Sequence, residues 1–232
     1  MNYFELTVTA YLLKDVYYTE ANEIIGKTIN KAMYLDSKLS VIHKRNCYKQ
    51  VCFNCFYPLE VDKTYRQGRI YVFKIRTLDD EFAYKIKKLL INVSSQDLKI
   101  LATDLKSISQ KHIAELYTMT PALVTVDNKH WLPGEDMILL QNRFQGNLEK
   151  KYKVFYGKEL KVEQSFIQYI QVLNKMAISI AYKNTKLLGS KFKIIPNDDE
   201  VSQVLAFMGE ATGIGEKSSS AGLGFCNAKY LK

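Results

Sequence analysis

The sequence predicts an α+β fold built from two tandem domains of similar plan, and three observations support this expectation. The order strand, helix, strand, strand, helix, strand is found in residues 1–108 and again in residues 109–232. That order is the ferredoxin-like, or RRM-like, arrangement. Each half has the length of a small domain. No linker rich in proline or serine divides them, so we expect the two halves to pack closely.

In the first half, the expected elements follow the periodicity of the apolar residues. Residues 2–13 alternate apolar and polar side chains, which is typical of a strand. A helix is expected from about Glu20, with Ile25, Ile29 and Met33 on its apolar stripe. The segment SKLSVIHKRN is expected to be a short connection to the next strand.

The rest of the first half predicts an antiparallel strand pair, a second helix and a last strand. The pair consists of KQVCFNCFYPL and GRIYVFKIRTL, with a turn at DKTYRQG between them. Asp79 and Asp80 are expected to open the helix, because acidic residues stabilise a first helical turn. The last strand of this half is expected at LKILATDLKSI.

The second half predicts nearly the same order of elements. HIAELYTMTPALVTV is expected to be extended, and Leu140, Phe144 and Leu148 predict a helix after it. KMAISIAYKN and KFKIIP are interpreted as a strand pair. Asn197 and Glu200 predict a capping box at the start of a further helix. GFCNAKYL is expected to be the closing strand, so a glycine-rich loop lies directly before it.

The charge balance favours a polyanionic partner. The chain has 33 lysines and arginines against 24 aspartates and glutamates, a formal net charge of +9. A basic surface attracts phosphates and releases their counterions on binding, which favours a nucleic acid. No apolar run reaches the roughly 18 residues of a membrane span, and the alternating N-terminus differs from a signal peptide. We therefore expect a cytoplasmic protein without a membrane partner.

Three of the four cysteines are close together, at Cys47, Cys52 and Cys55, and raise the question of a zinc site. His43 is a further candidate ligand. However, residues three apart on a strand point to opposite faces, and no second Cys-x-x-Cys completes a tetrahedral set. We expect buried, reduced thiols and no metal; a zinc-containing RNA-binding module is the alternative.

The stretch GIGEKSSSAGLG, residues 213–224, has the composition of a phosphate-binding loop. Glycines allow positive φ and let backbone N–H groups approach an anion, while lysine and serine side chains add donors. A Walker loop is excluded, because Glu216 separates Gly215 from Lys217 and a strand follows where a helix is needed. The alternative is a glycine-rich connection with a purely structural role.

This C-terminal pattern, Gly-hydrophobic-Gly, a polar spacer and Gly-hydrophobic-Gly, resembles the hallmark of the repeat-associated RAMP proteins of CRISPR systems. HKRNCYKQVCFNCFYPL and YRQGRIYVFKIRTLD add a resemblance to the CRISPR precursor-RNA processing endoribonucleases of that superfamily. The resemblance extends over essentially the whole chain. It implies the tandem ferredoxin-like fold that the element order also predicts.

The resemblance further implies a protein that binds CRISPR repeat RNA, either single-stranded or as a hairpin. Such a protein cleaves the precursor transcript without a metal or other cofactor. The 2′-hydroxyl attacks its own phosphodiester and leaves a 2′,3′-cyclic phosphate and a 5′-hydroxyl. The alternative is a non-catalytic RAMP RNA-binding subunit of a CRISPR effector complex. Other effector-complex subunits and a second copy of the chain are further partners that the family accommodates.

In the family that the chain resembles, the catalytic histidine lies between the first helix and the second strand, often with a lysine six residues on. His43 and Lys49 match this place and spacing. Histidine, with an ordinary pKa of about 6.5, acts as an acid or base at neutral pH, and lysine stabilises developing negative charge. Where some members have a catalytic tyrosine this chain has Thr28, so Tyr34 and Tyr48 are the candidates for that role.

The residues expected to bind RNA are basic, small or hydroxyl-bearing. Lys44 and Arg45 follow the histidine, and Lys150 and Lys151 belong to a basic stretch of the long helix. The glycine-rich loop contributes the remaining candidates, which are Gly213, Gly215, Lys217, Ser218, Ser219, Ser220, Gly222 and Gly224.

Overall fold

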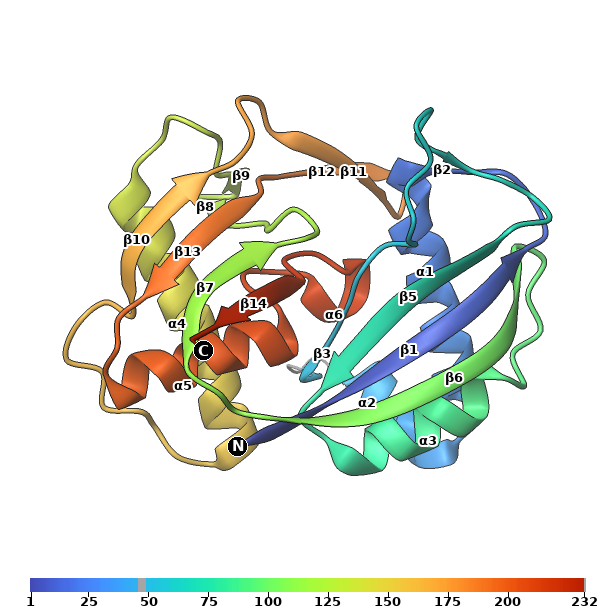
Figure 1. Ribbon diagram of the computed structural model, residues 1–232, viewed down its shortest axis with the longest axis horizontal. Coiled ribbons are helices and arrows are strands. Elements are labelled where there is room, and N and C mark those ends of the chain that lie inside the picture. Colours follow the sequence, from blue (N-terminus) through green and yellow to red (C-terminus); the bar gives the residue numbers. More distant parts are fainter. Residues whose placement is uncertain (46–48, 232) are drawn as a thin grey trace.

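The structure, a computed structural model that describes residues 1–45 and 49–231, contains two four-stranded antiparallel sheets side by side (Figure 1). The strand orders are β3-β5-β1-β6 and β10-β13-β7-β14. In each sheet the first strand of its half lies between the third and fourth, which is the ferredoxin-like arrangement. The predicted α+β fold with two ferredoxin-like halves is therefore confirmed.

The first half carries its helices on one face of its sheet (Figure 1). Its elements are β1 (Asn2–Leu12), β2 (Val16–Tyr17), α1 (Tyr18–Tyr34), α2 (Ser37–Lys44), β3 (Val51–Phe53), β4 (Thr64–Tyr65), β5 (Ile70–Thr77), α3 (Asp80–Leu90) and β6 (Leu98–Ser109). Leu6, Val8 and Ala10 of β1 are buried, as the alternation predicts. The carboxylate of Asp79 accepts a hydrogen bond from Phe82 N and caps α3.

The second half repeats this plan and adds a hairpin. Its elements are β7 (Ile113–Thr118), β8 (Thr125–Val126), β9 (Lys129–His130), α4 (Met137–Tyr156), β10 (Ile167–Val172), β11 (Ile178–Tyr182), β12 (Thr185–Gly189), β13 (Phe192–Pro196), α5 (Glu200–Thr212), α6 (Ser218–Ala221) and β14 (Cys226–Tyr230). Leu140, Phe144 and Leu148 of α4 are fully buried, as predicted. No helix in the described residues is long and apolar enough to cross a membrane.

Two expectations about the first half were wrong. The segment containing His43 is not a plain connection but the helix α2, which begins after Asp36 because its carboxylate accepts a hydrogen bond from Leu39 N. The strand predicted over KQVCFNCFYPL is limited to β3. After β3, Lys74 N donates to the side-chain oxygen of Asn54 (2.6 Å) in place of a main-chain oxygen, which interrupts the regular ladder. The main chains pair again only at a single bridge between Tyr57 and Val72.

Two expectations about the second half were also wrong. KMAISIAYKN does not pair with KFKIIP: β11 pairs with β12 across a two-residue turn, at which Lys183 and Asn184 both have positive φ. β13 instead pairs with β7 and with β10, a strand the sequence did not predict. The cap of α5 is Asp199, whose carboxylate accepts from Ser202 N, and not the expected Asn197–Glu200 box.

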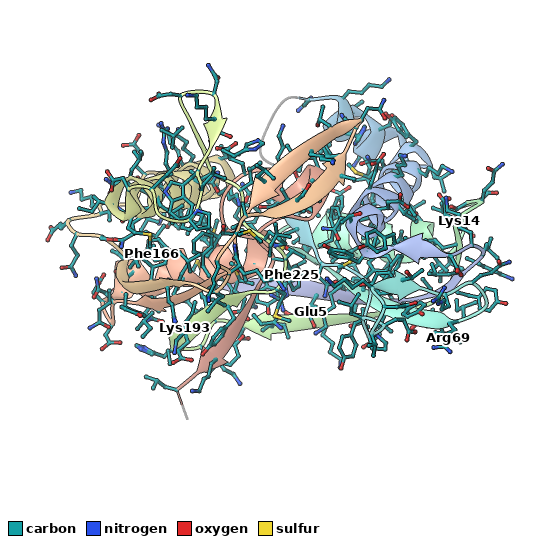
Figure 2. The ribbon with its side chains drawn as sticks, turned by 90° about the horizontal axis from the view of Figure 1, so that it is seen from above. Glu5, Lys14, Arg69, Phe166, Lys193 and Phe225 are labelled. Carbon is teal, nitrogen blue, oxygen red and sulfur yellow. The ribbon has the colours of Figure 1, made fainter. Side chains whose placement is uncertain are left out.

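A buried arginine joins the two halves. Arg76 of β5 is 3% exposed, and its Nε donates to the carboxylate of Glu5 (2.7 Å) within the first sheet. Its other nitrogens donate to the second half, to the carbonyl oxygens of Glu210 (3.1 Å) and Cys226 and to Asn227 Oδ1 (3.1 Å). The guanidinium also lies 4.2 Å from the ring centroid of Phe225. Figure 2 shows the partners Glu5 and Phe225 together at the centre of the molecule, where the halves meet.

Candidate functional site

The glycine-rich loop, residues 213–224, is folded tightly against both halves. Ile214 N donates to the carbonyl oxygen of Gly224 (2.8 Å), and Gly224 N donates to that of Pro121 (2.9 Å). On its other side, Asn22 Nδ2 of α1 donates to the carbonyl oxygens of Ala221 (3.0 Å) and Gly222 (3.2 Å). The loop is therefore held in one conformation by the second half and by the first helix.

The loop glycines are required for packing. At Gly224, with φ of +65°, a Cβ would lie 1.8 Å from the carbonyl oxygen of Ile214. At Gly222, with φ of +64°, a Cβ would lie 2.5 Å from the ring of Phe53. The N–H of Gly224, one of the loop residues expected to bind RNA, is already used within the protein, because it donates to the carbonyl oxygen of Pro121. The exposed side chains of the loop are those of Lys217 and Ser220, with Ser219 half-buried and Ser218 buried.

A pocket of about 430 Å³ lies between this loop and the first half. The first half lines it with the residues just before and at the start of β3, and the second half with α4, the end of α5 and the loop. Its lining residues are Lys49, Gln50, Val51, Asn147, Lys151, Thr212, Gly215, Glu216, Lys217, Ser218, Ser219 and Ser220. The pocket thus brings together Lys49, Lys151 and the Gly215–Ser220 part of the loop, which the sequence places far apart.

Lys151 does not lie on a solvated basic face as expected. Its side chain is 5% exposed, and Nζ donates to the carbonyl oxygens of Thr212 (3.2 Å) and Gly213 (2.6 Å) at the end of α5. Burial lowers the pKa of its ammonium to about 8. Lys151 therefore fixes the start of the glycine-rich loop, whereas its neighbour Lys150 is exposed.

His43 lies in the last turn of α2, half-buried, beside Tyr34 of α1. The two rings meet edge to face with their centroids 5.0 Å apart. Nδ1 of His43 is buried and has no hydrogen-bond partner among the described residues, so this nitrogen is closed to an external group. Lys49 Nζ donates to the carbonyl oxygen of His43 (2.9 Å), which connects the histidine to the pocket that Lys49 lines.

The environment of His43 lowers the pKa of its imidazole. Burial is the largest cause, and the positive charges of Lys49 and Lys183 add to it. The neutral imidazole, which can accept a proton, is therefore favoured near pH 7. Lys183 belongs to the turn between β11 and β12, so the second half contributes to the electrostatics of a residue in the first.

We expect the Lys183→Ala substitution to raise the pKa of His43, because a nearby cation disfavours the imidazolium and its removal relieves that effect. The measurement is an NMR titration of the His43 ring protons at low ionic strength. Lys186→Ala is the matched control: Lys186 is an exposed lysine of the same hairpin that does not act on His43. An unchanged or lower pKa in Lys183→Ala would contradict the arrangement.

The remaining expected residues are placed as follows. Lys44 and Arg45 are exposed directly after His43. Tyr48 and Cys47 lie outside the described residues. The other histidines have structural partners: His112 Nε2 lies 3.1 Å from the carboxylate of Asp198, and His130 Nδ1 accepts from Leu188 N (3.3 Å).

The cysteines that the structure describes are free thiols with separate partners. Cys52 is buried and donates to the carbonyl oxygen of Ala211, and burial raises the pKa of its thiol to about 12. Cys55 is hydrogen-bonded to the hydroxyl of Tyr65 (3.3 Å). Within residues 1–45 and 49–231, no three His, Cys, Asp or Glu side chains are grouped as metal ligands.

Sequence reasoning missed Gln50, Asn147 and Lys183. Gln50 and Asn147 line the pocket, but uncharged amides without a motif give no signal in a single sequence. Lys183 is one of many lysines, and only the hairpin brings its charge to His43. The burial of Lys151 did have a signal, because it continues the buried spacing of Phe144 and Leu148 along α4.

Comparisons with known proteins agree with this architecture. The family model described as CRISPR associated protein Cas6, C-terminal, matches residues 103–228, more than half of the chain. The search of curated proteins found no match.

Solved structures extend the likeness to the whole chain. A CRISPR associated protein Cas6 is 16% identical with a TM-score of 0.71, and the match covers 98% of this chain and 99% of the other. A Cas6-related protein of Pyrococcus furiosus is 15% identical with a TM-score of 0.72, covering 99% and 100%. A protein described as a RAMP protein binding different RNA substrates is 17% identical with a TM-score of 0.72, covering 97% and 99%. At these identities the likeness shows the fold.

Proposed function

Because the chain belongs to the CRISPR associated protein Cas6 family, we propose that it binds the repeat RNA of CRISPR transcripts and cleaves the strand within the repeat. The observation that carries this proposal is the connection between His43 and the pocket. Lys49 lines the pocket and donates to the carbonyl oxygen of His43, while the glycine-rich loop forms the opposite wall. The main chain of His43, whose imidazole is the proposed proton-transfer group, is thereby joined through Lys49 to a cationic, hydroxyl-rich cleft, and this supports a site for RNA cleavage.

The proposed reaction is a transesterification at one phosphodiester. His43, neutral because of its lowered pKa, takes the proton of the 2′-hydroxyl through Nε2, and the 2′-oxygen attacks the adjacent phosphorus. The bond from phosphorus to the 5′-oxygen breaks, and that oxygen takes a proton from the solvent or from a general acid. The products are a 2′,3′-cyclic phosphate and a 5′-hydroxyl.

The basic and hydroxyl side chains at the pocket are proposed to have two roles, stabilisation of developing charge and binding of the RNA backbone. Lys49, next to His43, stabilises the negative charge that develops on the phosphate oxygens. Lys217, Ser219 and Ser220 hold the RNA backbone at the opposite wall of the pocket. Tyr34, which contacts the ring of His43 edge-on, is proposed to orient that ring. Lys44 and Arg45, exposed directly after His43, add positive charge to this surface.

The test is incubation of the purified protein with the repeat RNA of its own CRISPR array, with analysis of both product ends. We expect a single cut, a 2′,3′-cyclic phosphate upstream and a 5′-hydroxyl downstream, with the same rate in EDTA. A 2′-deoxy nucleotide at the scissile position should stop cleavage and leave binding intact, because only the nucleophile is removed. Binding without cleavage of the unmodified repeat would support the non-catalytic subunit instead.

A further inference from the structure

The lining of the pocket between the two halves includes two buried amide oxygens that a phosphate group would not bind. Gln50 is 7% exposed, and its Nε2 donates to the carbonyl oxygen of Lys151 (2.9 Å). This bond fixes which end of the amide is oxygen. Oε1 is buried and has no hydrogen-bond partner among the described residues, and the same is true of Oδ1 of Asn147. Both residues line the pocket.

Two buried acceptors without hydrogen-bond donors raise the free energy of the folded protein. Only a ligand group that donates hydrogen bonds can satisfy them. A buried carbonyl oxygen loses its hydrogen bonds to water and gains none in return. A phosphate cannot compensate this loss, because its oxygens are acceptors and would be repelled. The ligand group that fits must donate, whereas the rim formed by Lys49, Lys217 and Ser219 attracts an anion.

A nucleotide combines both properties in one molecule. We propose that the pocket takes a single nucleotide of the bound RNA, with its phosphate at the lysine and serine rim. Its base, which carries an exocyclic amino group and is therefore adenine, cytosine or guanine, directs that group at Gln50 Oε1 and Asn147 Oδ1. The inference deepens the proposed function and depends on it, since the nucleotide belongs to the repeat RNA next to the His43 site.

The bases differ in how well they match the two amide oxygens of the pocket lining. The exocyclic amino group of adenine, cytosine or guanine offers two N–H donors on one nitrogen, one for each amide oxygen. Uracil presents one N–H between two carbonyl oxygens, which would face the acceptors and be repelled. The pocket is large enough for one nucleotide, and the side chain of Val51 adds an apolar surface for the base. Recognition of the pocket nucleotide therefore depends on its amino group.

The experiment deletes single amino groups from the repeat RNA. The probe is the repeat of the protein's own array, made non-cleavable by a 2′-deoxy nucleotide at the mapped scissile position. Each adenosine is replaced in turn by purine riboside, each cytidine by 2-pyrimidinone riboside and each guanosine by inosine, which remove only the exocyclic amine. We expect one position at which this deletion weakens binding about tenfold or more, because an acceptor is left unsatisfied.

Protein variants assign that position to the pocket. In the double variant Gln50→Leu with Asn147→Leu, the same amine deletion should no longer weaken binding, because neither acceptor remains. In each single variant the deletion should weaken binding less than in the wild type, because one of the two acceptors is gone. Asn142→Leu, an exposed asparagine of the same helix α4, is the control and should keep full sensitivity to the deletion. Thermal melting of each variant establishes that it is folded.

The outcomes separate this inference from the proposed function. If the wild type binds and cuts the repeat but no amine deletion matters, the nucleotide pocket is wrong and the nuclease proposal stands. The pocket is equally wrong if a sensitive position exists and stays as sensitive as in the wild type when both Gln50 and Asn147 are replaced by leucine. If the wild type does not bind the repeat at all, the proposed function itself fails.

Discussion

The His43→Ala variant is expected to cut the repeat RNA roughly 10² to 10⁴ times more slowly than the wild type, the usual contribution of general acid–base catalysis. Its affinity for the RNA should stay close to that of the wild type, because the imidazole is neutral in the free protein and adds no charge to the basic surface. The measurement is the single-turnover cleavage rate beside a binding titration on the non-cleavable repeat.

Two variants give this prediction its controls. His112→Ala removes a histidine that pairs with Asp198 away from the pocket, and it should cut at the wild-type rate. Lys49→Ala should slow cleavage by less than His43→Ala, since neighbouring cations partly replace its charge. If His43→Ala cuts as fast as the wild type, proton transfer belongs to another group, and Tyr34 is the next residue to substitute.

The Arg76→Met variant is expected to lose about 3–5 kcal/mol of the free energy of unfolding, the usual cost of leaving one partner of a buried ion pair behind. The substitution removes the bond to Glu5, which is itself buried, and the three donations to the second half. The loss should appear in urea unfolding as a lower midpoint. RNA binding should weaken in parallel, because Arg76 packs on Phe225, next to the glycine-rich loop.

Lys74→Met is the matched control, because Lys74 Nζ contacts the same carboxylate of Glu5 at 2.7 Å. The Lys74 side chain is substantially exposed, so its ion pair should contribute no more than about 1 kcal/mol. An equal decrease in the free energy of unfolding in the two variants would show that the hydrogen bonds from Arg76 to the second half do not contribute to stability.

The periodicity of the apolar residues determined most of the fold. Alternation along β1 and the helical spacing of α4 are local properties of the chain, and they place the same side chains inside in any fold of this class. The glycine pattern likewise located the loop, because all four of its glycines have positive φ and a Cβ at each would lie within 3.0 Å of another atom. Which strands pair with each other was harder to predict from the sequence. β11 pairs with β12 through a tight turn at Lys183 and Asn184, and this turn contains no glycine that would have indicated it.

The sequence by itself therefore determined the two ferredoxin-like halves, the glycine-rich loop between α5 and β14, and the candidate pair His43 and Lys49. Only the tertiary structure decided which polar groups are buried and which reach the pocket. It directed Nζ of Lys151, whose helical spacing already indicated burial, to the carbonyl oxygens at the end of α5, and it placed Gln50 and Asn147, about a hundred residues apart, around one cavity. Burial of a polar group depends on contacts between distant segments, and these contacts follow from how the two halves pack against each other, which no local pattern encodes.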